Sequence, residues 1–369
     1  MSKLLCAVLL LAASVAASAQ GARRKVILDQ DSVGPGGSNM LSMLLALQSP
    51  DVEVLGITVE SGDGWQDEDV AHALRMLELV GRTDVPVYRG STYPLVNSME
   101  SMERWEGMYG KIPYKGAWMK EWLENSTQEP RHYHAPEVVP PMKEGEPKIK
   151  AAEGTAAEFL VREARTYPGE ITIMAMGPLT NVALAVRLDD AFAANVKDLY
   201  WMGASLNPMP PKRDEYALEY LFSPRMNFNV RWDPEAAKIA MHAGFKKIVI
   251  VPTDATTETR FTPEMLETLK GSSSLAAKYA AKYPSVGMPL WDELTVAVWL
   301  DPKLIANSEK MSMDFNTDSG SAGYGETLTW RPGKGPGLGE PVVEAIRTVH
   351  VEEFDKIFLA GLMREAPQL

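Results

Sequence analysis

Short apolar runs alternate along this chain with longer segments of helical periodicity. Strands buried on both faces read as nearly continuous runs of Val, Ile and Leu, whereas helices repeat apolar residues at three- and four-residue spacing. Runs of the first kind predict strands at residues 25–28, 52–59, 171–176, 198–202 and 246–252. The helical pattern predicts helices at residues 39–47, 67–80, 155–165, 179–186, 234–241, 263–269 and 294–300.

This alternation of strands and helices predicts an α/β fold. A mostly parallel central sheet with helices on both faces is typical of such a pattern, and ligands then bind beyond the carboxyl ends of the strands. No stretch is rich enough in Pro, Gly and Ser to be a linker, so residues 20–369 are predicted to form a single domain. The aromatic-rich residues 98–125 and the Pro- and Glu-rich residues 131–150 are interpreted as loops or short helices inserted over the sheet edge.

The N-terminus has the three parts of an export signal. Lys3 precedes an apolar run at residues 4–11, and small residues follow as far as Ala17-Ser18-Ala19. This order predicts a signal peptide at residues 1–19 and a mature protein that is periplasmic or secreted; a buried first helix is the alternative. Cys6, the only cysteine, would leave with the signal, so the mature chain is expected to contain no disulfide.

Charge and hydropathy narrow the range of partners. The formal net charge is −12 at pH 7, and nucleic-acid phosphates would repel so acidic a surface. After the N-terminus no apolar run is long enough to span a bilayer, so no membrane anchor is expected. These observations favour a small molecule as the partner and leave a homo-oligomer open.

Two acidic segments are candidates for a cation site. Asp29 and Asp31 lie at the end of the first predicted strand, two residues apart, so their carboxylates are expected to point to the same side. The glycine-rich exit from this strand can bring further oxygens around a hard cation, although a helix cap plus a solvated carboxylate is the alternative. Asp292 lies at the start of a predicted helix, where an acidic residue most often only caps the helix.

Three other polar segments are weaker candidates. Asn227 and Asn229 flank a phenylalanine and would suit the hydroxyls of a sugar, or they are solvated amides of a loop. Met176 precedes Gly-Pro at a strand-to-helix junction, where its carbonyl can project into a cleft, but a tight turn explains the pattern equally. His132 and His134 have the spacing of zinc ligands without a second pair nearby.

Taken together and in order, these segments resemble the inosine-uridine-type nucleoside hydrolases, and most of all a divergent secreted branch of that family. The similarity extends from about residue 25 to residue 302, and its order along the chain is more specific than any one segment. It is carried by Val26-Ile27-Leu28-Asp29-Gln30-Asp31, Val54-Leu55-Gly56-Ile57-Thr58, Gly177-Pro178-Leu179-Thr180-Asn181, Trp201-Met202-Gly203, Asn227-Phe228-Asn229-Val230, Asp233-Pro234-Glu235-Ala236-Ala237, Val251-Pro252-Thr253-Asp254 and Pro289-Leu290-Trp291-Asp292.

The resemblance implies calcium-dependent hydrolysis of the N-glycosidic bond of ribonucleosides, giving ribose and the free base. In the family, carboxylates of the first motif, a strand-end carbonyl and a late aspartate hold Ca²⁺, which implies Asp31, the Met176 carbonyl and Asp292 here. The ion also binds the ribose 2′- and 3′-hydroxyls and the attacking water, and Asp31 is expected to be the general base. Asp29 is expected to lie behind the ligands and to orient the loop.

The sequence departs from the family pattern at several of these positions. Two adjacent aspartates of the family correspond to Ser38 and Asn39 when the segments are aligned on residues 44–47, or to Pro35 and Gly36 when they are aligned on Asp31. On the first alignment, Asn39 is expected to bind the ion through its amide oxygen and Ser38 to contact the substrate. Trp291 replaces a histidine that protonates the leaving base in some relatives, and we expect its indole to stack on the base. Asn227 replaces a glutamate near the ribose 5′-hydroxyl, and Asp63 replaces an asparagine.

The expected substrate contacts are therefore Ser38, Asp63, Asn227, Asn229 and the inserted Trp105. His132 or His134, on the Pro-rich loop, is an alternative source of a proton for the base. The lost aspartates and histidine also leave two other functions open. One is a non-catalytic exported protein that binds ribosides or sugars on the same fold, and the other is a hydrolase of another glycoside.

Overall fold

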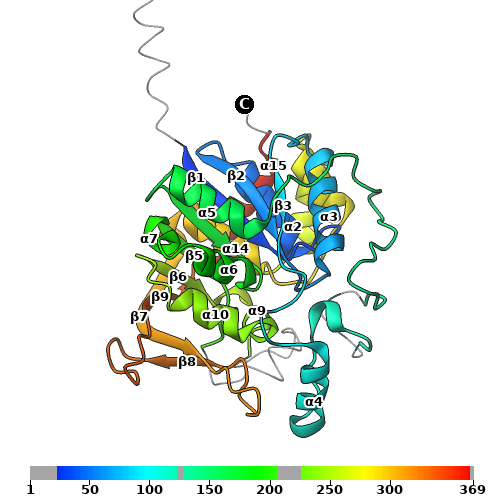
Figure 1. Cartoon of the computed structure of the whole chain (residues 1–369). Coiled ribbons are helices and arrows are strands. Elements are labelled where there is room, and N and C mark those ends of the chain that lie inside the picture. Colours follow the sequence, from blue (N-terminus) through cyan, green and yellow to red (C-terminus); the bar gives the residue numbers. More distant parts are fainter. Residues whose placement is uncertain (1–22, 123–127, 129, 207–225, 366–369) are drawn as a thin grey trace, which may run out of the picture.

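A nine-stranded sheet runs through the molecule (Figure 1), in the order β3-β2-β1-β4-β5-β6-β9-β7-β8. The computed structural model describes residues 23–122, 128, 130–206 and 226–365, so the predicted signal peptide at residues 1–19 lies outside the described residues. The strands are β1 Arg24–Gln30, β2 Val52–Val59, β3 Val87–Arg89, β4 Ile171–Ala175, β5 Asp198–Met202, β6 Ile248–Val251, β7 Ile305–Phe315, β8 Thr327–Trp330 and β9 Val342–Val349.

The strand order reverses between β1 and β4. β2 and β3 extend the sheet on one side of β1, and β4, β5 and β6 extend it on the other, all in parallel. β9 continues the sheet in parallel with β6, and β7 and β8 complete it as antiparallel strands. A reversal of this kind opens a crevice at the carboxyl ends of the two central strands, where α/β proteins bind ligands.

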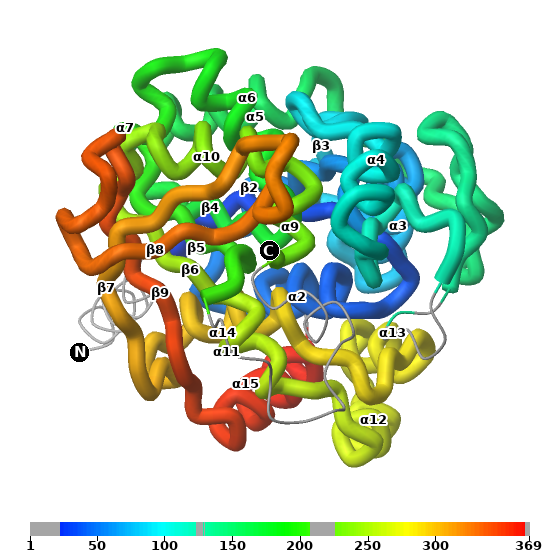
Figure 2. The backbone as a smooth tube through the Cα atoms, turned by 90° about the horizontal axis from the view of Figure 1, so that it is seen from below, coloured from blue at the N-terminus to red at the C-terminus, as the bar shows by residue number. Residues whose placement is uncertain are grey.

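Alternate residues of the strands pack into two hydrophobic cores, one on each face of the sheet. Val26 and Leu28 pack in the first core and Ile27 in the second, and β4, β5 and β6 alternate in the same way. Figure 2 shows the helices as layers on either side of the sheet. The first face carries α2 Gly37–Leu47, α3 Gln66–Leu79, α12 Pro263–Lys270, α13 Leu275–Lys282, α14 Trp291–Leu300 and α15 Val351–Met363. The second face carries α5 Ala156–Thr166, α6 Thr180–Leu188, α7 Phe192–Asn195 and α10 Pro234–Met241.

The predicted fold class is confirmed: the sheet is mostly parallel and helices cover both of its faces. β2, β5 and α10 have the predicted bounds. β6 is shorter than predicted, and α14 begins at Trp291 rather than at residue 294, which brings Asp292 into its first turn. Among the described residues no helix is both long and apolar enough to cross a membrane.

The aromatic-rich insertion forms α4 Met99–Tyr109 and the short helix η1 Gly116–Trp118, as expected of short helices at the sheet edge. Its Trp105 and Trp118 pack into a third hydrophobic cluster, in which Trp118 stacks on Trp232 at a ring-centroid distance of 4.1 Å. Residues 131–150 contain no helix or strand. The remaining short helices are α9 Phe228–Trp232, α11 Thr253–Thr256 and η2 Pro302–Leu304.

Candidate active site

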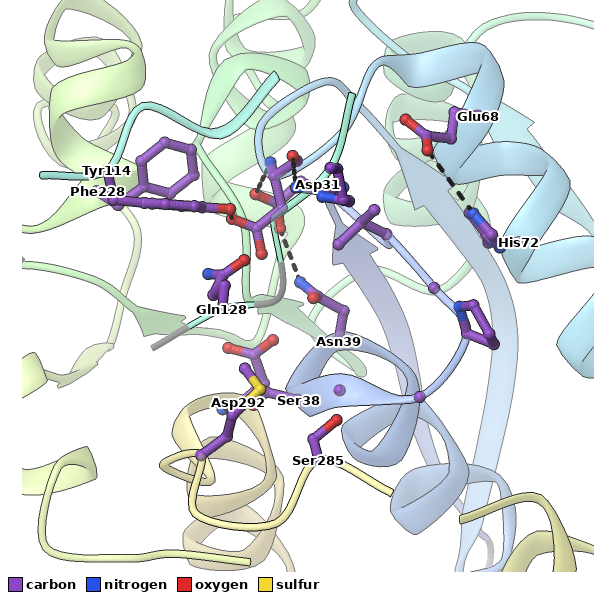
Figure 3. Close-up of a pocket in the computed structure, with 18 of the residues that line it drawn as sticks. Asp31, Ser38, Asn39, Glu68, His72, Tyr114, Gln128, Phe228, Ser285 and Asp292 are labelled. Carbon is purple, nitrogen blue, oxygen red and sulfur yellow. Dashed lines mark hydrogen bonds and ion pairs between the residues drawn. The ribbon is translucent and has the colours of Figure 1, made fainter. Parts of the chain in front are cut away.

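One cavity of about 670 Å³ opens where β1 and β4 end, at the reversal of the strand order. Its volume suits a small molecule. Figure 3 shows Tyr114 and Phe228 at one end and Glu68 and His72 at the other, with Asp31 and Asn39 between them and Asp292 below, beside Ser38. Of the residues singled out from the sequence, the lining includes Asp31, Ser38, Asn39, Asp63, His132, His134, Met176, Asn227, Asn229, Trp291 and Asp292.

Asp31 lies at the centre of this cavity, directly after β1. Its Oδ1 accepts a hydrogen bond from Asn39 Nδ2 at 3.1 Å, and its Oδ2 accepts one from the backbone N–H of Asp63 at 2.9 Å. Burial raises the pKa of Asp31 well above its ordinary value, and the charges of Asp63 and Asp292 raise it further. This mutual repulsion means that the ionised carboxylates would be stabilised by a bound cation.

Asp292 is held by contacts from two segments far away in the sequence. Its backbone N–H donates to Ser38 Oγ at 2.9 Å, and its Oδ2 accepts a hydrogen bond from Gln30 Nε2 at 3.0 Å. Burial raises the pKa of Asp292 to about 8, although the Gln30 hydrogen bond acts in the opposite direction. Ser38 also donates its hydroxyl proton to Glu293, so the hydroxyl is engaged on both sides by the start of α14.

The oxygen donors in this part of the cavity fit a hard divalent cation. They are the carboxylates of Asp31 and Asp292, the amide oxygen of Asn39 and the backbone carbonyl of Met176, all in the lining. Calcium prefers such oxygen ligands, whereas zinc prefers nitrogen and sulfur. No three His, Cys, Asp or Glu side chains of the described residues form a metal-holding group, so the fit depends on the amide and the carbonyl.

The Met176 carbonyl has one position left for such an ion. Asn229 donates its Nδ2 to the carbonyl oxygens of Met176 at 3.1 Å and Met202 at 2.8 Å, and so ties the ends of β4 and β5 together. A carbonyl oxygen has two lone pairs, so the second lone pair of Met176 stays available. Asn229 itself is in the cavity lining, as the sequence led us to expect.

Polar and aromatic side chains form the Tyr114 end of the cavity. Asp63 Oδ1 accepts a hydrogen bond from the Tyr114 hydroxyl at 2.7 Å, and the Tyr114 ring packs edge-on against Phe228 at 4.9 Å. Asn227 caps α9 and donates its Nδ2 to Thr253 Oγ1 at 2.8 Å. Carboxylate, amide and aromatic groups in one cleft are the combination that binds a hydroxyl-rich ring with an apolar face.

The opposite end of the cavity is lined from α3 and from residues 130–143. Burial would lower the pKa of His72, but hydrogen bonds to Glu144 and Glu68 raise it above its ordinary value. His134 directs Nε2 to Glu68 Oε2 at 3.1 Å and Nδ1 to the Ala135 carbonyl at 2.9 Å. Both ring nitrogens of His134 are therefore occupied within the protein.

The two candidate tryptophans lie in different surroundings. Trp291 is the first residue of α14, is partly buried and lines the cavity. Trp105 is absent from the lining: its Nε1 donates to the Ser321 carbonyl at 2.9 Å, and the Arg231 guanidinium lies 4.0 Å above its ring. The expected contact of Trp105 with the substrate is therefore not supported by its position.

Asp29 lies behind the cavity rather than in its lining. It accepts hydrogen bonds from Thr58 Oγ1 and from Asn181 Nδ2, the latter at 2.9 Å, and burial raises its pKa to about 6. Its partners therefore differ from those of Asp31, although alternation along a strand predicts the same side for both. These contacts tie the end of β1 to β2 and to α6, and the role of Asp29 in orienting the loop stays a prediction.

Gln30, Tyr114, His72 and Arg131 border or support the cavity, but the sequence gave no reason to select them. Gln30 had one usable signal, because strand alternation places it on the same face as Val26 and Leu28, where a buried amide needs partners. The other three reach the cavity through inserted loops or a helix whose orientation depends on the tertiary structure.

A family model, sequence relatives and solved structures all indicate similarity to nucleoside hydrolases. The family model for "Inosine-uridine preferring nucleoside hydrolase" matches residues 26–356. The chain is 31% identical to "Probable uridine nucleosidase 2" of Arabidopsis thaliana, over 78% of this chain and 81% of that protein. It is 24% identical to the pyrimidine-specific ribonucleoside hydrolase of Escherichia coli, over 83% of this chain and 87% of that protein. Among solved structures, the purine-preferring ribonucleoside hydrolase from Gardnerella vaginalis has a TM-score of 0.68 at 20% identity, covering 92% of this chain and 98% of that chain.

Proposed function

This chain belongs to the inosine-uridine preferring nucleoside hydrolase family, and on that premise we propose that it hydrolyses ribonucleosides with a calcium ion bound in the cavity at the ends of β1 and β4. Membership of the family makes the chain an enzyme of the nucleoside N-glycosidase class. The observation that carries the calcium proposal is the meeting of Asp31, Asn39, Met176 and Asp292 at the reversal of the strand order.

The proposed ligands are Asp31, Asn39 through Oδ1, the Met176 carbonyl and Asp292. When bound there, calcium would supply charge that lowers the pKa of a coordinated water and would hold the ribose hydroxyls. The chain contributes two negative charges from this set, because Asn39 is neutral. Burial is the main cause of the raised pKa values of Asp31 and Asp292, and neighbouring carboxylates raise both further, so a bound cation would favour the ionised forms.

Asp31 is the proposed general base. It lies at the centre of the cavity, and it can take the proton of the attacking water once it is ionised. Attack at the anomeric carbon passes through an oxocarbenium-like transition state. The negative charges of Asp31, Asp63 and Asp292 stabilise the positive charge that develops on the sugar ring.

Asp63, Asn227 and Asn229 are the proposed ribose contacts. All three are in the lining, and Asp63 and Asn227 lie beside the Tyr114–Phe228 pair. Ser38 is assigned a different role from the one that the sequence suggested. Its hydroxyl is engaged by the Asp292 N–H and by Glu293, so we assign it to holding Asp292 in place.

Trp291 is the proposed partner of the leaving base. Its indole borders the cavity next to Asp292, and stacking can favour protonation of the base by solvent. His132 and His134 also line the cavity, but both nitrogens of His134 already face oxygen acceptors. His134 would have to break one of these contacts to deliver a proton.

The N-terminal pattern supports export, with cleavage after Ala19. We propose a periplasmic or secreted mature enzyme of the divergent secreted branch that the sequence resembles. Sequencing the N-terminus of the protein recovered from the outside of an expressing cell should find Gln20 first. An uncleaved chain retained in the cytoplasm would contradict export.

A binding protein without turnover is the second candidate, because Ser38 and Asn39 replace two charged residues of the family motif. The discriminating experiment is release of ribose from a panel of purine and pyrimidine nucleosides by the mature chain. Hydrolysis of at least one nucleoside that ceases on chelation and returns with calcium supports the proposal. Binding of nucleosides without release of ribose would establish the second candidate.

A further inference from the structure

Gln30 is a completely buried amide that contacts three of the four proposed calcium ligands. Its Nε2 donates to Asp292 Oδ2 at 3.0 Å, to Ser42 Oγ at 3.1 Å and to the Asn39 carbonyl at 3.3 Å. Its Oε1 accepts from Asn39 Nδ2 at 3.1 Å and from the backbone N–H of Asp31 at 3.2 Å. No other contact described for the cavity joins the ends of β1, α2 and α14 through a single side chain.

The hydrogen-bond partners of Gln30 determine the positions of its amide oxygen Oε1 and its amide nitrogen Nε2. The Asp31 backbone N–H can only donate, so it must face the Gln30 oxygen. The Asn39 backbone carbonyl and the Asp292 carboxylate can accept, so they must face the Gln30 nitrogen. The orientation of Gln30 therefore follows from groups whose hydrogen-bonding character is fixed or nearly so.

This orientation in turn fixes the amide of Asn39. The Gln30 oxygen and Asp31 Oδ1 are both acceptors and both lie 3.1 Å from the Asn39 nitrogen. Asn39 therefore turns its nitrogen toward them and its oxygen away from them. If Asn39 were flipped, three oxygens would face one another without a proton. The amide oxygen is thus the end of Asn39 that is available to a cation in the cavity.

Gln30 also makes the two carboxylate oxygens of Asp292 different, because it binds only one of them. Oδ2 accepts the hydrogen bond from Gln30, while the Asp292 N–H is held by Ser38. Oδ1 is then the oxygen of Asp292 that is left for the cavity. A neutral amide achieves this without adding another negative charge beside Asp31, Asp63 and Asp292.

We propose that Gln30 is the positioning residue that sets the calcium affinity of this site, by presenting Asn39 Oδ1 and Asp292 Oδ1 to the ion. The inference rests on the proposed calcium site. Residues that orient metal ligands in this way typically change metal affinity by roughly 10- to 100-fold when they are removed. Gln30 would thereby make a site with only two carboxylate ligands sufficiently ordered to bind calcium.

The test is calorimetric titration of the full mature chain with calcium alone, comparing the wild type with Gln30→Met. Methionine has a similar length but makes no comparable hydrogen bonds. The expected dissociation constant for calcium is roughly 10- to 100-fold higher in Gln30→Met. Gln30→Asn has a side chain too short to reach both Asn39 and Asp292, so its calcium affinity is expected to fall in the same way. This second variant covers the case in which Gln30→Met does not fold.

Gln48→Met is the matched control. Gln48 is also a buried glutamine, but its side chain donates to Ser274 and to the Arg364 carbonyl rather than to any proposed calcium ligand. It is expected to lose stability and to keep the calcium affinity of the wild type. The rise in melting temperature that calcium causes should therefore shrink in Gln30→Met and not in Gln48→Met, and excess calcium should restore nucleoside hydrolysis by Gln30→Met.

The outcomes separate the two proposals. Calcium binding by the wild type with an unchanged dissociation constant in Gln30→Met and Gln30→Asn would overturn the role of Gln30 alone. Equal loss of affinity in Gln30→Met and Gln48→Met would assign Gln30 a purely structural role and would also overturn it. A wild-type chain that binds no calcium would overturn the proposed calcium site together with this inference.

Discussion

Trp291 and Trp105 lie in different surroundings, and this difference allows a test of how the nucleobase leaves. Trp291 lines the cavity, whereas Trp105 is buried between Ser321 and Arg231. If stacking on Trp291 assists protonation, Trp291→Ala should lower turnover of purine nucleosides by roughly 10²–10⁴-fold, the usual value of acid assistance. The turnover rate of Trp291→Ala on nitrophenyl riboside should stay close to that of the wild type, because this leaving group needs no proton.

Trp105→Ala is the control for this prediction. It removes an indole of the same size from outside the cavity, so it should lower stability without changing the ratio of the two turnover rates. Steady-state kinetics on both substrates measures that ratio. An equal loss on both substrates in Trp291→Ala would mean that the indole shapes the cavity and does not assist departure.

The second prediction concerns the contribution of the Ser38 hydroxyl to stability. Its removal leaves Glu293, which is completely buried, without the hydrogen bond that Ser38 donates. We expect Ser38→Ala to lower the free energy of unfolding by about 1–3 kcal/mol, the cost of an unsatisfied buried polar group. Urea denaturation measures the difference. Ser273→Ala, which removes an exposed hydrogen bond to Glu365, is the control and should change stability little.

If Ser38→Ala unfolds at the same urea concentration as the wild type but binds nucleosides more weakly, the original expectation of a substrate contact would be restored. The assignment of Ser38 to holding Asp292 would then be wrong.

Helix α3 fastens residues 131–149 over one end of the cavity. Glu68 contacts His134, and His72 contacts Glu144. Further along the helix, Glu78 accepts hydrogen bonds from the backbone of Lys148 at 2.6 Å and from the next residue at 2.8 Å. Residues 138–143 between these contacts contribute to the cavity wall. The helix therefore supports a wall that has no secondary structure of its own.

The His72–Glu144 contact makes the stability of this region depend on pH. The pKa of His72 in the folded protein is raised, so the contact stabilises the fold fully below the ordinary pKa of histidine, about 6.5. The contribution is lost as pH rises through the higher folded-state value. Glu144→Gln should therefore reduce the free energy of unfolding most near pH 6 and progressively less at higher pH.

Denaturant titration of the wild type and Glu144→Gln across this pH range measures the effect. His72→Gln provides the background in which Glu144→Gln should cost the same free energy at every pH. A loss from Glu144→Gln that stays constant with pH when His72 is present would contradict a protonated His72 in this contact.

The five adjacent parallel strands β2-β1-β4-β5-β6 were predictable because each is a local apolar run, whereas β3, β7, β8 and β9 were not predicted. β5 is buried throughout and β2 over its second half, and the bounds of both could be predicted from the sequence alone. β7 was missed because its first half is polar and largely exposed, and only pairing with β8 and β9 makes it a strand. Long-range pairing of this kind leaves little local signal.

The candidate site could be predicted in part for the same reason. Asp31, Asn39, Met176 and Asp292 follow strands or begin helices, where topology brings side chains together. The roles of Gln30 and Ser38 depend on contacts with Asp292, which is more than 250 residues away in each case. Such contacts exist only once α14 packs on α2, and no local pattern indicates them.

The most direct test of the proposed calcium and ribose site is a crystal structure of the mature chain grown with calcium and ribose. We expect one ion in the cavity, bound by Asp31, Asn39 Oδ1, the Met176 carbonyl and Asp292, with ribose hydroxyls completing its coordination. Carboxylate and carbonyl oxygens should lie about 2.3–2.6 Å from the ion, as in other calcium sites. Ribose bound without an ion, or an ion bound only outside this cavity, would contradict the proposal.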